Sequence, residues 1–388
     1  MTVLVTDGGE RAALAVVRSL GRHEAVVVAS PYGRSVAGAS RFARLEVQIP
    51  SPLDAPAKFA EAVAGIVRAH AIDAVFPVSD AACRALVGAR ATLGAAHLLA
   101  PTADAYTRLS NKLEVARLAA AHGLGVPPGR EALSLDAALS TAAELGYPTV
   151  LKPATSVVEA GGDAARKTGI VRVADAAALR VAWPQLAELA PVLVQRSVPG
   201  WGEGIFLLRW GGRTRAAFAH RRLREKPPEG GVSVLCESVA LDPDRTRRVE
   251  AVMDAVGYEG LAMAEFKADG RDAWLMEFNA RPWGSLQLAV DAGVDFPRLL
   301  LEAFRGTVRD DPPRYAIGVR SRWLLGDVDH ALALVRGGID SRGRSGLLAA
   351  LGVLLRPAGR RCRWEDPRLE DPAPFFRALH GWLLALVR

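Results

Sequence analysis

The stretch that decides the fold reads Leu-Ala-Met-Ala-Glu-Phe at residues 261–266 and Ala-Trp-Leu-Met-Glu-Phe-Asn-Ala-Arg at residues 273–281. Asp269-Gly270 lies between the two segments and is typical of a tight turn, so we predict the two strands of a β-hairpin. Successive side chains of a strand point to opposite faces. The face pointing toward a core is expected to carry Trp274, Met276 and Phe278.

The other face of the second strand is expected to carry Glu277, Asn279 and Arg281. If the register places Glu265 opposite Glu277, two carboxylates and an amide oxygen come together, which suits a Mg²⁺ ion held on nucleotide phosphates. Arg281 beside them suits a transferring phosphoryl group. A solvated edge hairpin is the alternative. It accounts for an isolated pair of glutamates but not for the whole string Glu-Phe-Asn-Ala-Arg-Pro-Trp-Gly-Ser.

This segment resembles the metal-binding end of the ATP-grasp superfamily. In that family, a Glu on one strand and a Glu-x-Asn on the next hold Mg²⁺ against the ATP phosphates, and an Arg two residues later contacts the γ-phosphate. The resemblance implies that Glu265, Glu277 and Asn279 bind the metal, which would be Mg²⁺ with Mn²⁺ as a substitute, and that Arg281 is catalytic. It also implies an α/β (α+β overall) ATP-grasp fold.

Composition restricts the class of protein. A chain of 388 residues that is 50% hydrophobic and 23% charged indicates two or three folded domains. We expect a cytoplasmic protein without a signal peptide, because the N-terminus lacks a basic start, and without a transmembrane segment, because no long apolar run exists. The three cysteines, Cys83, Cys236 and Cys362, are far apart and indicate a reducing compartment.

The net charge of +7 could indicate a nucleic-acid partner. Arginines are dispersed along the chain, so we interpret the charge as compositional bias and expect no nucleic acid. Only six of the 49 basic residues are lysines, which makes each lysine informative. A lysine among so many arginines can mark a site that needs a compact charge.

The chain divides into four expected segments. Residues 1–100 alternate strand and helix, which predicts a parallel sheet with helices on both faces, and the resemblance implies that this segment is a Rossmann-like pre-ATP-grasp domain. The turn at Asp7-Gly8-Gly9 lacks the spacing of a dinucleotide-binding motif. Residues 101–199 are expected to form a helical linker and a small lid, residues 200–305 the catalytic subdomain, and residues 306–388 a mostly helical C-terminal extension.

Two lysines are candidates for phosphate binding. Lys152 ends an apolar strand at 149–153, and a loop of small residues from Ser156 to Gly162 follows it. Lys112 opens a helix that precedes a Gly-x-Pro-Pro loop. The resemblance implies that both lysines contact ATP and that Lys152 takes part in catalysis. The loop departs from the common family pattern because Glu159 and Asp163 interrupt its glycines.

A strand at 192–196 that runs into Ser197-Val198-Pro199-Gly200 is predicted as an adenine-binding hinge, although an ordinary strand exit explains it too. The resemblance implies that Gln195 and Val198 contact adenine. It also implies that Glu203 contacts ribose.

The basic segment 220–226 precedes a Pro/Gly-rich loop. We predict that Arg222 and Arg224 share one strand face and bind a substrate carboxylate, with a solvated sheet edge as the alternative. His220 is expected to be packed or exposed rather than a base.

The apolar segments 346–355 and 375–387 in the last part of the chain could touch a membrane surface. Docking onto the catalytic domain or onto a second subunit, as in a homodimer, is the favoured alternative.

The basic segment 220–226 also resembles one predicted branch of ATP-grasp carboxylate–amine ligases, and the resemblance implies a ligase of that kind. ATP and Mg²⁺ would activate a small-molecule carboxylate as an acyl phosphate, and an amine or thiol would capture it. Three alternatives stay open: a carboxylase or carbamoyl-phosphate-type ATP-grasp enzyme, a non-catalytic ATP-binding protein, and a nicotinamide oxidoreductase using the first domain.

Overall fold

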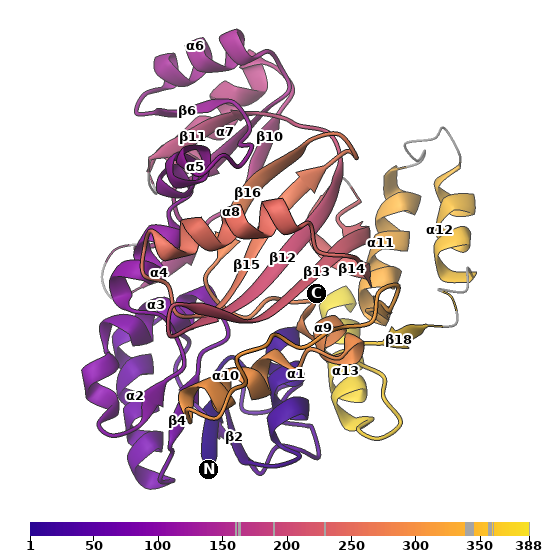
Figure 1. Cartoon of the computed structure of the whole chain (residues 1–388). Helices are drawn as coiled ribbons and strands as arrows, with labels where there is room; N and C mark the ends of the chain where they lie inside the picture. The colour runs from indigo at the N-terminus through magenta and orange to yellow at the C-terminus, as the bar shows by residue number, and fades with distance from the viewer. Residues whose placement is uncertain are drawn as a thin grey trace.

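The computed structural model describes residues 1–159, 161, 164–188, 191–228, 230–337, 345–355, 359 and 361–387. Gly162 and Asp163 of the expected glycine loop lie outside these residues. Within the described part, the chain forms three sheets and one two-stranded ribbon (Figure 1). The expected α/β fold class is confirmed.

The N-terminal segment forms a parallel five-stranded sheet in the order β3-β2-β1-β4-β5, as the alternation of strand and helix predicts. Leu4 faces the side covered by α2 and α3, and Val3 and Val5 face the side covered by α1. The elements are β1 (Thr2–Val5), α1 (Arg11–Leu20), β2 (Ala25–Ser30), β3 (Leu45–Gln48), α2 (Pro56–Ala69), β4 (Ala74–Phe76), α3 (Asp80–Gly88), a 3₁₀ turn (Arg90–Leu93) and β5 (His97–Leu98).

A smaller antiparallel sheet in the order β10-β7-β11-β6 follows, with α6 and α7 packed on it. It lies above the larger sheet in Figure 1. The ribbon β8-β9 occupies the place of the expected loop. The elements are α4 (Ala103–Ser110), α5 (Lys112–Ala121), β6 (Gly129–Ala132), α6 (Leu135–Leu145), β7 (Thr149–Pro153), β8 (Val157–Glu159), β9 (Ala165–Lys167), β10 (Val171–Val173), α7 (Ala176–Ala187) and β11 (Val192–Arg196).

The largest sheet has the order β16-β15-β12-β13-β14-β17-β18. Helix α8 covers one face, and α9, α10 and α1 cover part of the other. The elements are β12 (Trp201–Trp210), β13 (Arg213–Lys226), β14 (Val232–Ser238), α8 (Pro243–Asp254), β15 (Gly260–Ala268), β16 (Ala273–Asn279), α9 (Leu286–Ala292) and α10 (Phe296–Phe304).

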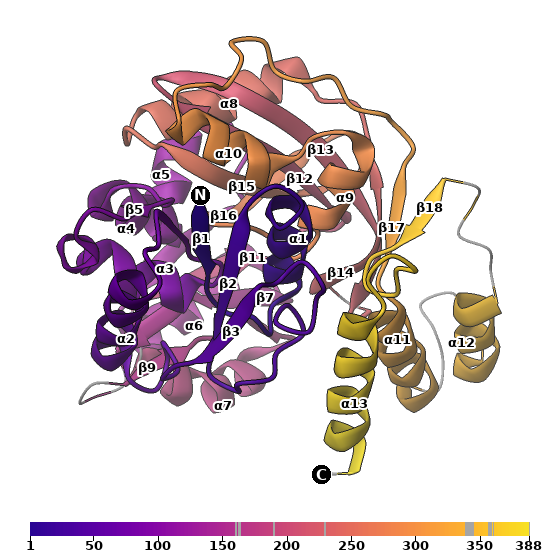
Figure 2. The same ribbon diagram turned by 90° about the horizontal axis from the view of Figure 1, so that it is seen from below.

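The final segment is not purely a helical appendage, because β17 (Arg320–Arg322) and β18 (Cys362–Trp364) extend the largest sheet. Three helices accompany them: α11 (Leu324–Gly337), α12 (Gly346–Leu355) and α13 (Ala373–Val387). Figure 2 shows all three on one side of the molecule, next to β17 and β18. Among the described residues, no helix is long and apolar enough to cross a bilayer. The four-segment division itself remains a prediction.

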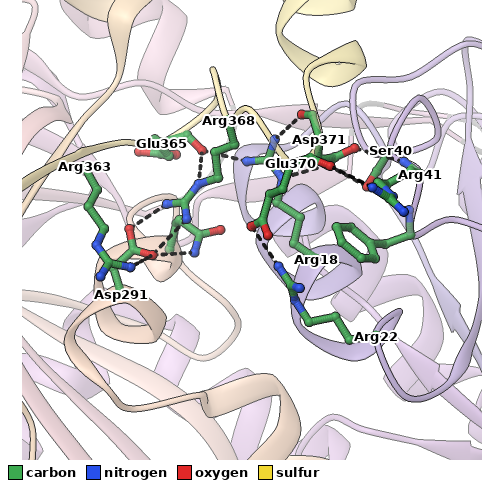
Figure 3. Close-up of polar contacts among 12 residues, drawn as sticks. Arg18, Arg22, Ser40, Arg41, Asp291, Arg363, Glu365, Arg368, Glu370 and Asp371 are labelled. Carbon is green, nitrogen blue, oxygen red and sulfur yellow. Dashed lines mark hydrogen bonds and ion pairs between the residues drawn. The ribbon is translucent and has the colours of Figure 1, made fainter.

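A strap at residues 363–371 ties this final segment to the rest of the chain (Figure 3). Arg18 of α1 is buried, and its Nε lies 2.9 Å from Asp371 Oδ2. Arg368 Nη2 lies 2.6 Å from Oδ2 of Asp291 on α9. The strap therefore joins α1, beside the N-terminal sheet, to α9, beside the largest sheet.

Candidate active site

The hairpin that the sequence predicts is present, and its register places Glu265 directly opposite Glu277. Directly opposed residues of an antiparallel pair share a face, so both carboxylates lie on the same side of the sheet. Asn279 follows two residues after Glu277 on that face. The predicted convergence of two carboxylates and an amide is confirmed.

The prediction for the core-facing side chains is wrong in part. The register shifts between Glu265 and Phe266, so one extra residue of β16 interrupts the alternation. Leu275 and Phe278 are buried, whereas Trp274 and Met276 are half-buried. The bulge turns Met276 toward the site, where its Sδ lies 4.0 Å from Lys152 Nζ.

Lys112 is positioned by the start of α5. Asn111 caps this helix, since its Oδ1 accepts hydrogen bonds from the backbone N–H groups of Leu113 and Glu114. The Lys112 side chain is buried, and its Nζ lies 3.6 Å from Glu277 Oε2. It also donates to Ser156 Oγ at 2.8 Å. Lys112 thus connects the linker helix, the ribbon and the carboxylate hairpin.

Lys152 comes from β7 and is 6% exposed. Burial lowers the pKa of its ammonium below the ordinary value, because a buried charge loses its hydration. The Glu277 carboxylate opposes this change, while the neighbouring Lys112 adds to it. The ammonium groups of Lys152 and Lys112 therefore lie near each other, and the burial of Lys152 is unfavourable while it is charged. A polyanion is the kind of ligand that such a pair of positive charges suits.

Arg281 follows β16 and makes contact with the N-terminal sheet. Its Nε lies 2.7 Å from Oδ2 of Asp80, the first residue of α3. Its Nη2 donates to Asn279 Oδ1 at 3.1 Å. Burial is the largest influence on the pKa of Arg281 and would lower it, but the charge and the hydrogen bond of Asp80, with smaller contributions from other groups, together raise it. Arg281 is therefore a fixed cation beside the predicted metal ligands.

Arg222 of β13 faces Glu265. The two side chains form a two-point ion pair, with distances of 2.9 Å (Nη1 to Oε1) and 2.6 Å (Nη2 to Oε2). Arg222 Nη1 also contacts Glu225 Oε1 at 3.0 Å and the Gly231 carbonyl at 2.9 Å. Burial opposes the charge of Arg222, yet Glu265 and Glu225 together raise its pKa.

Arg224 does not join Arg222, which corrects the prediction that they share a strand face. The register of β13 against β14 shifts on both sides of Arg224. Its guanidinium pairs with Asp327 of α11, a fully buried carboxylate that also pairs with Arg322. A guanidinium held in this way serves the packing of α11.

The predicted nucleotide contacts divide into two groups. Gln195 and Val198 are buried near the end of β11, and Gln195 Oε1 has no hydrogen-bond partner among the described residues. An orphaned buried amide oxygen is consistent with a missing donor such as an adenine amino group.

Glu203 is different, because it lies opposite Phe266 and hence on the α8 face of the sheet, away from Glu265. Its two oxygens contact Trp201 Nε1 at 2.8 Å and Arg245 Nη1 at 2.9 Å. The structure does not bring Glu203 to the other site residues, and Glu203 is therefore not part of the proposed nucleotide site.

His220 is fully buried and packs edge-on against Phe206, as the expectation of a packed residue requires. Its Nδ1 lies 3.3 Å from Ser285 Oγ. Burial, with Arg222 nearby, lowers the pKa of His220 well below its ordinary value.

Two hollows lie beside the cluster. A cleft of about 1130 Å³ has Asp80, Ser156 and Asn279 on its walls. The two lysines and two glutamates of the site do not line this cleft: Lys112, Lys152, Glu265 and Glu277. A pocket of about 200 Å³ is lined by Asp80 and Arg281 together with Lys167 of the ribbon and the turn at Gly9. Asp80 and Asn279 border spaces that are large enough for small molecules.

The residues present fit a Mg²⁺ ion. Carboxylate oxygens of Glu265 and Glu277 and the amide oxygen of Asn279 are hard ligands on one face, and Mg²⁺ usually takes one or two carboxylates and completes its shell with phosphates and water. Arg222 and Lys112 now neutralise these carboxylates. A metal ion would share or replace their charge.

Residues 188–326 match the family described as ATP-grasp in the biosynthetic pathway with Ter operon. That match covers the hinge, the basic strand and the carboxylate hairpin. The chain has the ATP-grasp fold. No curated protein matches its sequence.

Solved ATP-grasp structures extend the likeness to most of the chain. An ADP complex of N5-carboxyaminoimidazole ribonucleotide synthetase is 16% identical with a TM-score of 0.62, covering 82% of this chain and 80% of that one. Biotin carboxylase from Campylobacter jejuni is 18% identical with a TM-score of 0.65, covering 82% and 74%. The L-amino acid ligase from Bacillus licheniformis is 18% identical with a TM-score of 0.59, covering 80% and 77%. At these identities the likeness concerns the fold.

Sequence reasoning missed Asp80, Ser156 and Glu225, each of which contacts a predicted site residue. Asp80 had a detectable signal, because it stands just after β4, and the carboxyl ends of parallel strands collect functional groups. Ser156 and Glu225 had none, since only tertiary packing brings them to Lys112 and Arg222.

Proposed function

We propose that this protein is an ATP- and Mg²⁺-dependent ligase that activates a carboxylate as an acyl phosphate for attack by an amine or thiol. The observation that carries the proposal is the convergence of Lys112 and Lys152 on Glu277, from three segments far apart in the sequence. Two buried ammonium groups facing paired carboxylates form a site for a triphosphate with its metal ion. The ATP-grasp fold supports this proposal.

In the proposed reaction, Glu265, Glu277 and Asn279 hold Mg²⁺, which would neutralise the β- and γ-phosphates. Lys112 and Lys152 bind the phosphate oxygens, and the backbone at Val198 with the side chain of Gln195 binds adenine. Phosphoryl transfer needs little covalent help from a protein, so positioning and charge do most of the work.

An oxygen of the substrate carboxylate attacks the γ-phosphorus, the bond to the β,γ-bridging oxygen breaks, and ADP leaves. Arg281 stabilises the charge on the transferring group. Arg222 offers a cation for the substrate carboxylate if the metal ion releases it from Glu265. The amine nitrogen then attacks the acyl carbon, inorganic phosphate leaves, and the amine loses its proton to solvent.

The experiment is an ADP-release screen over pooled amino acids and small carboxylic acids, with and without amines and thiols, followed by mass spectrometry of products. We expect ADP formation that needs both an acid and a nucleophile, and a product whose mass equals their sum less water. Tight ATP binding without ADP release across the panel would instead indicate a non-catalytic ATP-binding protein. ADP release supported by bicarbonate alone would indicate a carboxylase.

A further inference from the structure

The guanidinium of Arg222 is shared by two carboxylates, and the proposed reaction uses only one of them. Its Nη2 lies 2.6 Å from Glu265 Oε2. Its Nη1 lies 2.9 Å from Glu265 Oε1 and 3.0 Å from Glu225 Oε1, and it donates to the Gly231 carbonyl at 2.9 Å. The side chain of Glu225 is 16% exposed, so the second partner is held inside the molecule. Glu225 is therefore a largely buried carboxylate beside the site without an assigned role.

The irregular end of β13 brings Glu225 to Arg222. In a regular strand, residues three apart point to opposite faces of the sheet. The pairing of β13 with β14 shifts between Arg222 and Arg224 and again between Arg224 and Glu225. Shifts of this kind interrupt the alternation and re-aim side chains. The contact between Arg222 and Glu225 thus depends on a local irregularity of the strand.

The neighbouring strand β12 leaves room for this pair because residue 202 is a glycine. A Cβ atom on Gly202 would lie 2.7 Å from Arg222 Cδ and 2.9 Å from Glu225 Oε1. Both distances are shorter than non-bonded atoms tolerate, so a side chain at this position would displace one member of the pair. Arg222 and Glu225 therefore pack into the space that Gly202 leaves open.

Helix α11 fixes the backbone of Glu225. The Glu225 carbonyl accepts a hydrogen bond from His330 Nδ1 at 2.6 Å. The next residue, Lys226, forms an ion pair with Asp329 of the same helix. Figure 1 shows α11 beside the strand β14 that pairs with β13. The final segment of the chain thus sets the position of Glu225 against Arg222.

This arrangement gives Arg222 a second partner when Glu265 binds a cation. A guanidinium keeps its charge in proteins, so Arg222 cannot become neutral when it loses Glu265. A buried charge without a partner is strongly unfavourable. Glu225 and the Gly231 carbonyl offset that penalty, because both already contact Nη1. We propose that Glu225 is a positioning residue that retains Arg222 while Glu265 binds a divalent cation, an inference that rests on the proposed function.

The test is calorimetric binding of β,γ-imido ATP, measured once with Mg²⁺ and once with EDTA. Glu225→Gln should weaken binding of the Mg²⁺ complex at least ~10-fold, because Arg222 would stay on Glu265 and oppose the metal ion. Binding in EDTA should stay at the wild-type value, since no cation then competes for Glu265. This difference between the two buffers separates positioning from a general loss of structure.

The matched control is Glu237→Gln. Glu237 is 17% exposed and forms an ion pair of 2.9 Å with Arg320. It lies opposite Arg221 on β13, and hence on the other face of the sheet from Arg222. This variant removes a similarly buried carboxylate from the same sheet and should bind the analogue as the wild type does in both buffers.

A double-mutant cycle shows whether Glu225 acts through Arg222. In the variant Arg222→Met the guanidinium is gone, so adding Glu225→Gln should cause no further loss of affinity for the Mg²⁺ complex. A merely structural role would lower the affinity by the same factor with and without Arg222. Thermal unfolding of every variant in both buffers establishes that the fold is intact.

The outcomes separate this inference from the proposed function. Wild-type affinity of Glu225→Gln for the Mg²⁺ complex, an equal loss in EDTA, or an equal loss in the Arg222→Met background would overturn the role of Glu225 and leave the metal site standing. If Mg²⁺ does not strengthen binding of the analogue by the wild type, the metal site of the proposed function is rejected, and the role of Glu225 is rejected with it.

Discussion

Arg222 and Glu265 form a two-point ion pair across the largest sheet, with N–O distances of 2.9 and 2.6 Å. Glu265 is also a predicted Mg²⁺ ligand. The Arg222 guanidinium therefore supplies the positive charge that a bound metal ion would otherwise supply to this carboxylate. The pair is largely buried, with 10% and 21% of the two side chains exposed. Arg222 and the proposed metal ion would therefore be alternative sources of charge for the same carboxylate.

Replacing Arg222 by methionine should destabilise the metal-free protein by roughly 2–3 kcal/mol, because Glu265 would be left without its partner. We expect Mg²⁺ with a non-hydrolysable ATP analogue to restore part of this loss. Thermal unfolding in EDTA and in Mg²⁺ measures the difference. Arg224→Met is the control, since Arg224 pairs with Asp327 and its loss should not respond to Mg²⁺. An equal loss for Arg222→Met under both conditions would contradict the shared role of this charge.

The variant Glu277→Gln should lose at least ~100-fold in ATP turnover, because it removes a charge from the transition-state environment of the phosphoryl group. Steady-state ADP release measures the effect. Glu144→Gln, on an exposed ion pair of α6, is the matched control and should turn over ATP as the wild type does. Near-wild-type turnover by Glu277→Gln would reject the metal assignment.

Lys152 is a proposed ATP contact, and its burial also affects the free energy of unfolding. Its pKa is lowered by burial, so between the lowered value and the ordinary 10.5 the unfolded chain holds more protons than the folded one. The free energy of unfolding should therefore rise with pH in that window, and the penalty should be fully present below it. We expect Lys152→Met to raise the melting temperature at neutral pH while weakening ATP binding at least ~10-fold.

The pKa of Lys152 can be measured directly by carbon-13 NMR of labelled lysine, because the chain has only six lysines. Adding Mg²⁺ and an ATP analogue should raise it, since the phosphates favour the ammonium. A titration at the ordinary lysine value, unchanged by nucleotide, would show that Lys152 is neither buried nor in contact with phosphate.

The ion pair between Arg281, which follows β16, and Asp80, the first residue of α3, has an N–O distance of 2.7 Å and connects the largest sheet to the N-terminal domain. Asp80→Asn should leave Arg281 in place but less firmly oriented, and we expect a loss of about 3–10-fold in turnover with little change in the KM for ATP. Arg281→Met should lose about 100-fold. If Asp80→Asn changes only the melting temperature, the pair serves domain packing alone.

The strap makes two neighbouring ion pairs with α1 and the turn that follows it, one of them buried and the other about half exposed (Figure 3). Arg18 and Asp371 are 4% and 1% exposed, and Arg18 also donates to the carbonyl groups of Glu365 and Asp366. Arg18→Met should cost about 3–5 kcal/mol, as expected when one partner of a buried pair is removed. Arg22→Met, whose pair with Glu370 is about half exposed, should cost less than ~1 kcal/mol. Urea denaturation measures both, and a loss for Arg18→Met as small as that for Arg22→Met would mean that the strap does not hold the chain ends together.

The sequence alone determined the hairpin and placed Glu277 and Asn279 on one face of its second strand, because alternation along a strand and a tight turn are local properties. The register that sets Glu265 opposite Glu277 came from the structure. It also determined the N-terminal parallel sheet, since apolar strands alternating with amphipathic helices leave few arrangements.

Only the tertiary structure decided which side chains meet across segments. The bulge at Met276, the shifts around Arg224 and the opposite face taken by Glu203 depend on neighbouring strands, whose register a single strand does not encode. The contacts of Lys112 with Ser156 and of Arg281 with Asp80 join residues 44 and 201 positions apart, and chain folding alone brings them together.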